Sequence, residues 1–150
     1  MNHKDLNVWK KSIELVTEIY KITETLPRTE DFGLKSQLQR AAVSVPTNIA
    51  EGSGRTHQKE MNQFCYIALG SLTEVETLLI ICNNVYQTDI KDIIEKHTSV
   101  RRLLLAFIKH LKTNPKPLTL NSITPNSITP NPYPLIQQPL TLNSALADNS

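Results

Sequence analysis

The chain has 150 residues, of which 39% are hydrophobic and 20% are charged, which is typical of one soluble globular domain. No run of about 18 apolar residues is present, so a membrane-spanning segment is not expected. The first residues lack the apolar core of a signal peptide, so the cytoplasm is the expected compartment. A net charge of +2 is too small to mark the whole chain as a nucleic-acid binder.

The charges are unevenly distributed along the chain. Residues 1–95 carry 10 basic and 13 acidic side chains, whereas 96–116 carry six basic side chains and no acidic one. A basic block of this kind can contact phosphate groups. It can equally be the C-terminus of a helix, where cations complement the helix dipole. Both interpretations remain open at this point.

A first helix is predicted over about 5–25, where apolar residues recur at steps of three and four. They form two neighbouring stripes, which indicates that this helix meets more than one neighbour. The first stripe consists of Leu6, Trp9, Ile13, Val16 and Tyr20, and the second of Leu15, Ile19, Ile22 and Leu26. Pro27 ends the helix, and residues 28–33 form a turn.

A second helix is predicted over about 34–51. Pro46 should kink this helix, and Gly52 and Gly54 should end it. Its alanines and Ser44 permit a close contact between helices. Its inward-facing residues are Leu34, Leu38, Ala41, Ala42, Val45 and Ile49.

The third predicted helix, about 57–86, is the longest. Its apolar residues keep a heptad spacing, which is typical of coiled-coil-like packing. They are Met61, Cys65, Ala68, Leu72, Val75, Leu79, Cys82 and Tyr86. Gly70 in mid-helix suggests the close approach of another helix. Cys65 and Cys82 would lie about 25 Å apart on this helix, too far for a disulfide, so two buried and inert thiols are expected.

A fourth helix is predicted over about 89–112, with Asp89 as its N-cap. Its apolar residues are Ile90, Ile93, Ile94, Leu104, Phe107, Ile108 and Leu111. Four helices with short connections predict an all-α fold, an antiparallel up-down-up-down four-helix bundle over residues 1–112.

Composition changes sharply near Thr113. Seven of the nine prolines follow this residue, and the five-residue segment 121–125 is repeated directly at 126–130. Proline at this density blocks helix and interior strand, and few large apolar groups remain to offset the entropy of ordering. Residues 113–150 are therefore predicted to be a disordered tail without a function of its own, with a docking peptide as the alternative.

A search for catalytic or metal-binding patterns finds little. No Glu-x-x-His pair is present for a di-iron site, and the two distant cysteines have no zinc spacing. The four histidines, His3, His57, His97 and His110, are interpreted as surface residues. The segment 52–55 is interpreted as a turn between helices, although an anion can bind the helix N-terminus that follows it. No enzyme activity, metal or cofactor is expected.

A series of polar residues follows the second helix at steps of three and four. Two of them, Glu51 and Arg55, have the spacing of an ion pair within a helix. Such a series indicates either a hydrogen-bonded network at a helix or subunit interface, or a binding site for a ligand or RNA. Its members are Gln37, Arg40, Ser44, Asn48, Glu51 and Arg55.

These same residues carry a resemblance to a known family. The chain resembles the 23S rRNA intervening-sequence proteins over about residues 5–110. The resemblance is most specific in the central segment, which reads Arg40-Ala41-Ala42-x-Ser44-Val45-Pro46-x-Asn48-Ile49-Ala50-Glu51-Gly52-x-Gly54-Arg55. Further matches are Trp9-Lys10-x-Ser12, Ile19-Tyr20-Lys21-x-Thr23, Phe32-Gly33-Leu34-x-x-Gln37-Leu38 and Phe64-x-x-Ile67-Ala68-x-Gly70-Ser71-Leu72-x-Glu74.

The resemblance implies a four-helix bundle that assembles as a homopentamer. It also implies a relation to the accessory variability determinant of diversity-generating retroelements, whose members are basic pentamers that bind nucleic acid and partner a reverse transcriptase. This chain is only weakly basic compared with that branch. Because aromatic residues are few, any binding of RNA or other nucleic acid should be led by backbone contacts.

The predicted function is that of a non-enzymatic, homo-oligomeric accessory protein that binds nucleic acid or a ribonucleoprotein, with a reverse transcriptase as a partner. The predicted nucleic-acid-binding residues are Arg55, Lys59, Arg101, Arg102, Lys109 and Lys112. The alternative is a structural protein-interaction module, encoded in an rRNA intervening sequence, that binds no nucleic acid.

Overall fold

Four α-helices make up most of residues 1–114, the part of the chain that this computed structural model describes. They are α1 (Asn7–Thr23), α2 (Leu34–Ser53), α3 (Gln58–Tyr86) and α4 (Lys91–Thr113), and two single-turn 3-10 helices, η1 (His3–Asp5) and η2 (Arg28–Glu30), precede α1 and α2. Each predicted helix is confirmed to within two residues at both ends. The predicted tail lies outside the described residues except for Thr113, which ends α4, and Asn114.

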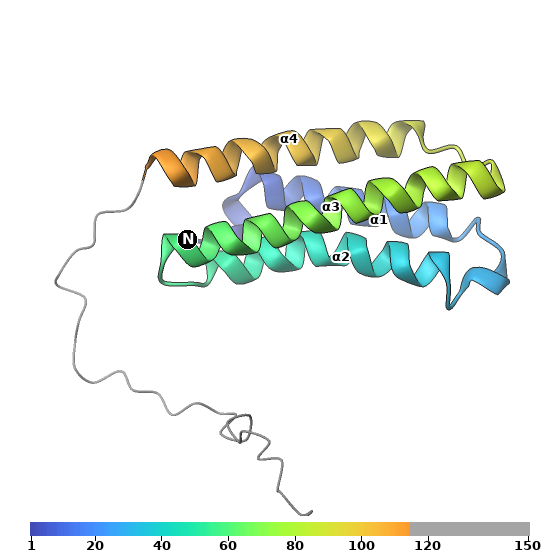
Figure 1. Cartoon of the computed structure of the whole chain (residues 1–150), viewed down its shortest axis with the longest axis horizontal. Helices are drawn as coiled ribbons and strands as arrows, with labels where there is room; N and C mark the ends of the chain where they lie inside the picture. Colours follow the sequence, from blue (N-terminus) through green and yellow to red (C-terminus); the bar gives the residue numbers. More distant parts are fainter. Residues whose placement is uncertain (115–150) are drawn as a thin grey trace, which may run out of the picture. The chain divides into compact units, whose positions relative to one another are not determined.

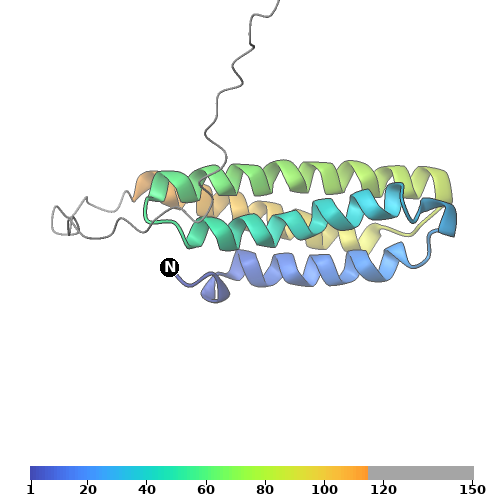
Figure 2. The ribbon, with the colours of Figure 1, turned by 90° about the horizontal axis from the view of Figure 1, so that it is seen from below.

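The helices run side by side, and each short connection reverses the direction of the chain (Figures 1 and 2). Each helix packs on the helix that follows it, and α1 also packs on α4, whereas the backbones of the diagonal pairs stay more than 8 Å apart. The predicted all-α, up-down-up-down antiparallel bundle is therefore confirmed for the described residues, which contain no strand. The first turn of α3 and the last turn of α4 consequently lie at the same end of the bundle, where the Gln58 side chain donates a hydrogen bond to the carbonyl oxygen of Asn114 at 2.9 Å.

The heptad positions of α3 form the centre of the core. All of its predicted apolar residues are buried apart from Tyr86, which is half-buried. By length and composition alone α3 could also cross a membrane, although no membrane-spanning segment is predicted from the sequence. The apolar character of α3 has a second explanation, because its buried side chains pack on α2 and α4 in the bundle.

The two apolar stripes of α1 have different environments. In the second stripe Leu15, Ile19 and Leu26 are buried, and they belong to the bundle core. In the first stripe Ile13 and Tyr20 are exposed, and the other members are only half-buried. The prediction that this helix meets more than one neighbour is confirmed, since α1 packs on both α2 and α4. Part of the first stripe nevertheless remains uncovered.

Two glycines show where the helices approach closely. A Cβ atom on Gly52 would lie 2.7 Å from the Met61 sulfur and 2.8 Å from the Cβ of Phe64, so α2 and α3 meet here at a separation that only glycine allows. Gly70 is exposed, and nothing lies within 4 Å of the position its Cβ would take. The prediction of a close helix at Gly70 is therefore wrong within the described bundle, because this residue faces away from the core stripe of α3.

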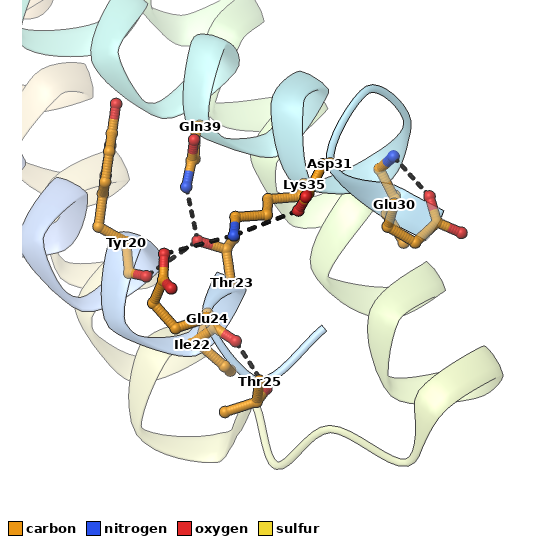
Figure 3. Close-up of polar contacts among 10 residues, drawn as sticks. Tyr20, Ile22, Thr23, Glu24, Thr25, Glu30, Asp31, Lys35 and Gln39 are labelled. Carbon is orange, nitrogen blue, oxygen red and sulfur yellow. Dashed lines mark hydrogen bonds and ion pairs between the residues drawn. The ribbon is translucent and has the colours of Figure 1, made fainter. Parts of the chain in front are cut away.

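The turn between α1 and α2 is held by polar side chains that the sequence analysis does not identify (Figure 3). The Glu30 carboxylate accepts the Leu34 backbone N–H at 2.8 Å and thereby caps the start of α2. Its other oxygen accepts the hydroxyl hydrogen bond of Tyr86, on the last turn of α3. The Gln39 amide donates to the Thr23 hydroxyl at 2.8 Å, which joins α1 to α2. The turn is therefore fixed to three helices.

At the start of α4 the predicted cap is displaced. The helix begins at Lys91, and its N-cap residue is Ile90, not Asp89. The Asp89 carboxylate still accepts the Lys91 backbone N–H at 3.1 Å. Asp89 thus bonds the first backbone N–H of α4 from the position before the N-cap, one residue earlier than predicted.

Candidate nucleic-acid interface

The basic side chains of α4 are exposed and largely unpaired. Arg101, Arg102 and Lys109 are exposed, and none of their side chains forms an ion pair or hydrogen bond with another described residue. Together with Lys112 they form what we call the basic face of α4. Arg101 and Lys112 are eleven residues apart, about 16 Å along the helix axis. Cations without acidic partners over this length are free to contact several consecutive phosphates.

The helix dipole accounts for only part of this charge. Lys112 and His110 lie in the last turn of α4, where cations complement the dipole. Arg101 and Arg102 lie about three turns before the end of the helix. Because the dipole effect falls off within the last turn, it does not explain why these two arginines are present.

Lys112 contacts an aromatic side chain of α3. Its ammonium group donates a hydrogen bond to the Tyr66 hydroxyl at 2.7 Å and lies 5.2 Å from the centre of the ring. The hydroxyl oxygen therefore lies between the ammonium group and the ring. The contact is a hydrogen bond at the edge of the tyrosine, so Lys112 does not cover either face of the ring.

The two remaining predicted residues flank the turn between α2 and α3. Arg55 is paired with Glu51 at 2.6 Å and lies over the Phe64 ring at 5.0 Å, so its charge is partly neutralised. Lys59 is exposed and unpaired in the first turn of α3. The N-cap residue of this helix, His57, makes no side-chain hydrogen bond to the first turn.

The structure brings four of the six predicted binding residues to one end of the bundle. Arg55 and Lys59 lie at the start of α3, and Lys109 and Lys112 lie near the end of α4. Arg101 and Arg102 lie further along α4 and extend this basic surface toward the middle of the bundle. A pocket of about 260 Å³ lies at the same end, between the α2–α3 turn and the last turn of α4, and both Arg55 and His110 line it.

The predicted polar series on α2 is only partly a network. Asn48 donates to the Ser44 hydroxyl at 2.9 Å, and Ser71 of α3 donates to the same hydroxyl at 2.9 Å. Gln37 and Arg40 are exposed, and their side chains form no hydrogen bond or ion pair with described residues. The ion pair between Glu51 and Arg55 is confirmed but lies apart from the serine pair. The spacing on α2 could not identify Ser71, because a partner on another helix has no fixed separation in sequence.

The interpretation of His97 as a surface residue is wrong. Its side chain is fully buried, and its Nε2 lies 2.8 Å from the carbonyl oxygen of Leu72 on α3. The other ring nitrogen is buried without a hydrogen-bond partner. Histidine is polar, but residue 97 continues the buried stripe formed by Ile93, Val100 and Leu104, so its spacing indicates a core position.

Both cysteines are buried and free, as predicted. Burial raises the pKa of the Cys65 thiol to about 12 and also raises the pKa of Cys82. Since the thiolate is the reactive form, neither side chain is arranged as a nucleophile at neutral pH. Among residues 1–114 no group of three His, Cys, Asp or Glu side chains is close enough to hold a metal ion.

Comparison with known proteins agrees with the fold. A crystal structure of a Bacteroides thetaiotaomicron protein of unknown function, from the S23 ribosomal protein family, superposes with a TM-score of 0.64 at 23% sequence identity, and the match covers 73% of this chain and 99% of that one. Among curated proteins no sequence matches. A family profile of 23S rRNA-intervening sequence proteins matches residues 4–106, more than two thirds of the chain. The chain therefore belongs to the 23S rRNA-intervening sequence protein family.

Proposed function

We propose that this protein is a non-enzymatic accessory protein that associates with itself and binds the phosphate backbone of a nucleic acid through the basic face of α4. The observation that carries the proposal is the absence of acidic partners around Arg101, Arg102 and Lys109 in the described part of the chain. Their charge therefore stays available for phosphate, whose neutralisation releases counterions and favours binding.

Self-association would multiply this charge. A shallow apolar groove of about 490 Å³ runs between α1 and α2, and we call it the α1–α2 groove. It is lined by Trp9, Ile13, Val16, Val43, Pro46, Thr47, Ala50 and Glu51. Exposed apolar surface of this kind marks contact sites between proteins. Five copies, the number that the family resemblance implies, would bring five basic faces into one particle.

The family of this chain suggests which nucleic acid and which protein partner to consider. The family name refers to intervening sequences of 23S rRNA, which makes RNA the first nucleic acid to consider. The resemblance to the accessory variability determinant adds a reverse transcriptase as the proposed protein partner. A particle that carries several basic faces is suited to hold an RNA near such an enzyme without reading its sequence.

A substitution experiment tests the proposal. Replacement of Arg101, Arg102 and Lys109 together by glutamate should lower the affinity for a structured RNA at least tenfold, because three phosphate contacts are lost and three repulsive charges are added. Fluorescence anisotropy at two salt concentrations measures the affinity. Binding by the unchanged protein should weaken steeply with salt, since each neutralised phosphate contributes a slope of about −0.9 in log affinity against log salt on a duplex.

A control separates the position of the charges from their number. Lys4, Lys10 and Arg28 are also exposed, without an ion pair among the described residues, and lie outside the basic face. Their replacement by glutamate changes the net charge by the same amount and should have a much smaller effect on RNA binding. Equal losses in the two triple variants would show that only net charge matters and would remove the assignment to α4.

The α1–α2 groove favours one alternative function, a protein-interaction module that binds no nucleic acid. If the unchanged protein shows no RNA binding even at low salt while remaining oligomeric, this alternative replaces the proposal. The basic face of α4 would then serve only for solubility and as a complement to the helix dipole.

A further inference from the structure

We infer that Tyr66 is a stacking platform for an unpaired nucleobase, so that the protein prefers single-stranded nucleic acid to duplex. The inference rests on the proposed function and specifies which form of nucleic acid the basic face of α4 accepts. Tyr66 was not among the residues predicted to bind nucleic acid, and the low aromatic content of the chain argued against base stacking. The structure places this one aromatic ring directly beside the basic face.

The first observation is the exposure of the ring. Tyr66 is 45% exposed on α3, and its hydroxyl group is fixed by the hydrogen bond from Lys112 on α4. This bond holds the side chain in one orientation across the α3–α4 contact. Because the ammonium group lies at the hydroxyl end, it does not cover the faces of the ring. A base that stacks on an already ordered ring loses less entropy than one that must first order a mobile side chain.

The second observation is the charge around the ring. Lys112 has three N–H donors and uses one of them for Tyr66, so the others remain available for a phosphate. Arg101, Leu105 and Lys112 are separated by steps of four and seven residues, and they therefore share one side of α4. Leu105 is 41% exposed between the two cations. A strand that follows this line meets cations at its phosphates and apolar or aromatic surface at its bases.

A duplex can contact the cations of the basic face through its phosphates, but its bases cannot stack on the Tyr66 ring. In a duplex the faces of the bases are covered by their neighbours, and a ring on the outside of a helical bundle reaches only phosphates and groove edges. Single strands can turn their bases outward onto aromatic side chains. Stacking also tolerates any sequence, because every base has a flat face, which agrees with a protein that recognises form and not sequence.

The test compares two probes and three substitutions at one position. The probes are a single-stranded 20-nucleotide RNA made only of uridine and a blunt RNA duplex of 20 base pairs, and the affinity of each is measured by anisotropy. Tyr66→Ala should weaken binding of the single strand by roughly five- to a hundredfold, the range typical of a lost base–aromatic stack. The same substitution should change binding of the duplex by less than about twofold.

Two further variants separate stacking from other effects. Tyr66→Phe keeps the aromatic ring and loses the hydrogen bond to Lys112, so it should retain most of the single-strand affinity. Tyr66→Leu keeps an apolar side chain without an aromatic face and should behave like alanine. Because Tyr66 is exposed, all three variants should fold, and circular dichroism and the particle mass of each variant would test this.

The outcomes distinguish this inference from the proposed function. If the unchanged protein binds neither probe at low salt, both are overturned. If it binds both probes equally and Tyr66→Ala changes neither affinity, the stacking platform is wrong while backbone binding stands. Loss of single-strand binding in Tyr66→Phe as well would also overturn stacking and assign the effect to the hydroxyl group.

Discussion

Two glycines in the long helices have opposite surroundings, which determines what a methyl group would do at each. At Gly52 the added Cβ would meet the Cβ of Phe64 at 2.8 Å, an atom fixed close to the α3 backbone that cannot rotate away. At Gly70 the position is open. The energetic effect of the same substitution should therefore differ in sign between the two sites.

We predict that Gly52→Ala lowers the free energy of unfolding by about 1–3 kcal/mol, because α2 must move away from α3. Gly70→Ala should raise it by about 0.4–1 kcal/mol, because alanine restricts the unfolded chain and favours helix. Urea denaturation measures both values. A destabilising Gly70→Ala would mean that another surface packs on this residue in solution, and the particle mass of the variant would then show whether that surface belongs to a second copy.

His97 shows at the same scale how a polar residue can belong to a core. The Leu72 carbonyl oxygen accepts a hydrogen bond in the usual i to i+4 pattern of α3, and the imidazole adds a second contact at its other side. The ring therefore links α3 to α4 at the centre of the bundle. Its remaining nitrogen lacks a partner, so the site is less favourable than one in which every polar atom is satisfied.

At the scale of single elements, the turn between α1 and α2 depends on one carboxylate. Glu30 accepts hydrogen bonds from the first turn of α2 and from Tyr86 at the end of α3. The Tyr86 hydroxyl, and after it the Leu34 N–H, lower the pKa of Glu30 below its usual 4.5. The ionised form is thus the one that the folded state favours.

The sign of the pH dependence follows from this shift. A carboxyl whose pKa is lower in the folded state contributes stability above about pH 4.5, and this contribution is lost as the pH falls through the lower, folded-state pKa. We predict that Tyr86→Phe is less stable than the unchanged protein at pH 7 and that the difference narrows below pH 4.5. Chemical denaturation at a series of pH values measures the difference. If the difference in free energy of unfolding between the two proteins stays constant down to pH 3, the hydrogen bond from Tyr86 to Glu30 does not account for the loss of stability.

The basic face of α4 extends well beyond the last turn of the helix. Sequence spacing alone left open whether these cations complement the helix dipole or contact phosphate. The position of Arg101 and Arg102 about three turns from the helix end removes the dipole as an explanation for them. The helix dipole still accounts for Lys112, which lies in the last turn of α4. The same lysine donates a hydrogen bond to Tyr66.

At the scale of the whole molecule, the bundle buries one apolar stripe of α1 and leaves part of the other in solvent. Ile13 and Val43, on opposite sides of the α1–α2 groove, are each 39% exposed. Water contact with a continuous apolar groove is unfavourable, at roughly 25 cal/mol for each Å² that a second copy could cover. The groove is therefore the surface at which we expect self-association.

We predict that the protein is an oligomer and that the double substitution Ile13→Glu and Val43→Glu converts it to a monomer that keeps its helical content. Two buried carboxylates at a contact between copies would lack partners, which is strongly unfavourable. Analytical ultracentrifugation measures the mass. Leu105→Glu, an apolar-to-acidic change at an exposed site on α4, serves as the control and should leave the mass unchanged.

A double variant that remains oligomeric would place the contact elsewhere, for instance on the exposed isoleucines of α3. These are Ile67, Ile80 and Ile81. A monomeric unchanged protein would contradict self-association altogether and with it the multiplied charge on which the proposed RNA binding partly depends.

The sequence by itself determined the four helices, their antiparallel order and most of the core. Helical periodicity is a local property, so the spacing of Leu38, Ala42, Val45 and Ile49 identifies a buried face without knowledge of what covers it. The short connections leave few alternatives to an up-down arrangement. The ion pair between Glu51 and Arg55 was also predictable, since both residues lie on one helix at a fixed spacing.

Only the tertiary structure decided the contacts between side chains of different helices. The hydrogen bond between Tyr86 and Glu30, the pairing of Ser44 with Ser71 and the position of Tyr66 beside Lys112 all join residues whose separation in sequence carries no signal. Which stripe of α1 lies in the core was undecided for the same reason. Periodicity shows that a helix has a face to bury, whereas the rotation of each helix against its neighbours determines which residues meet.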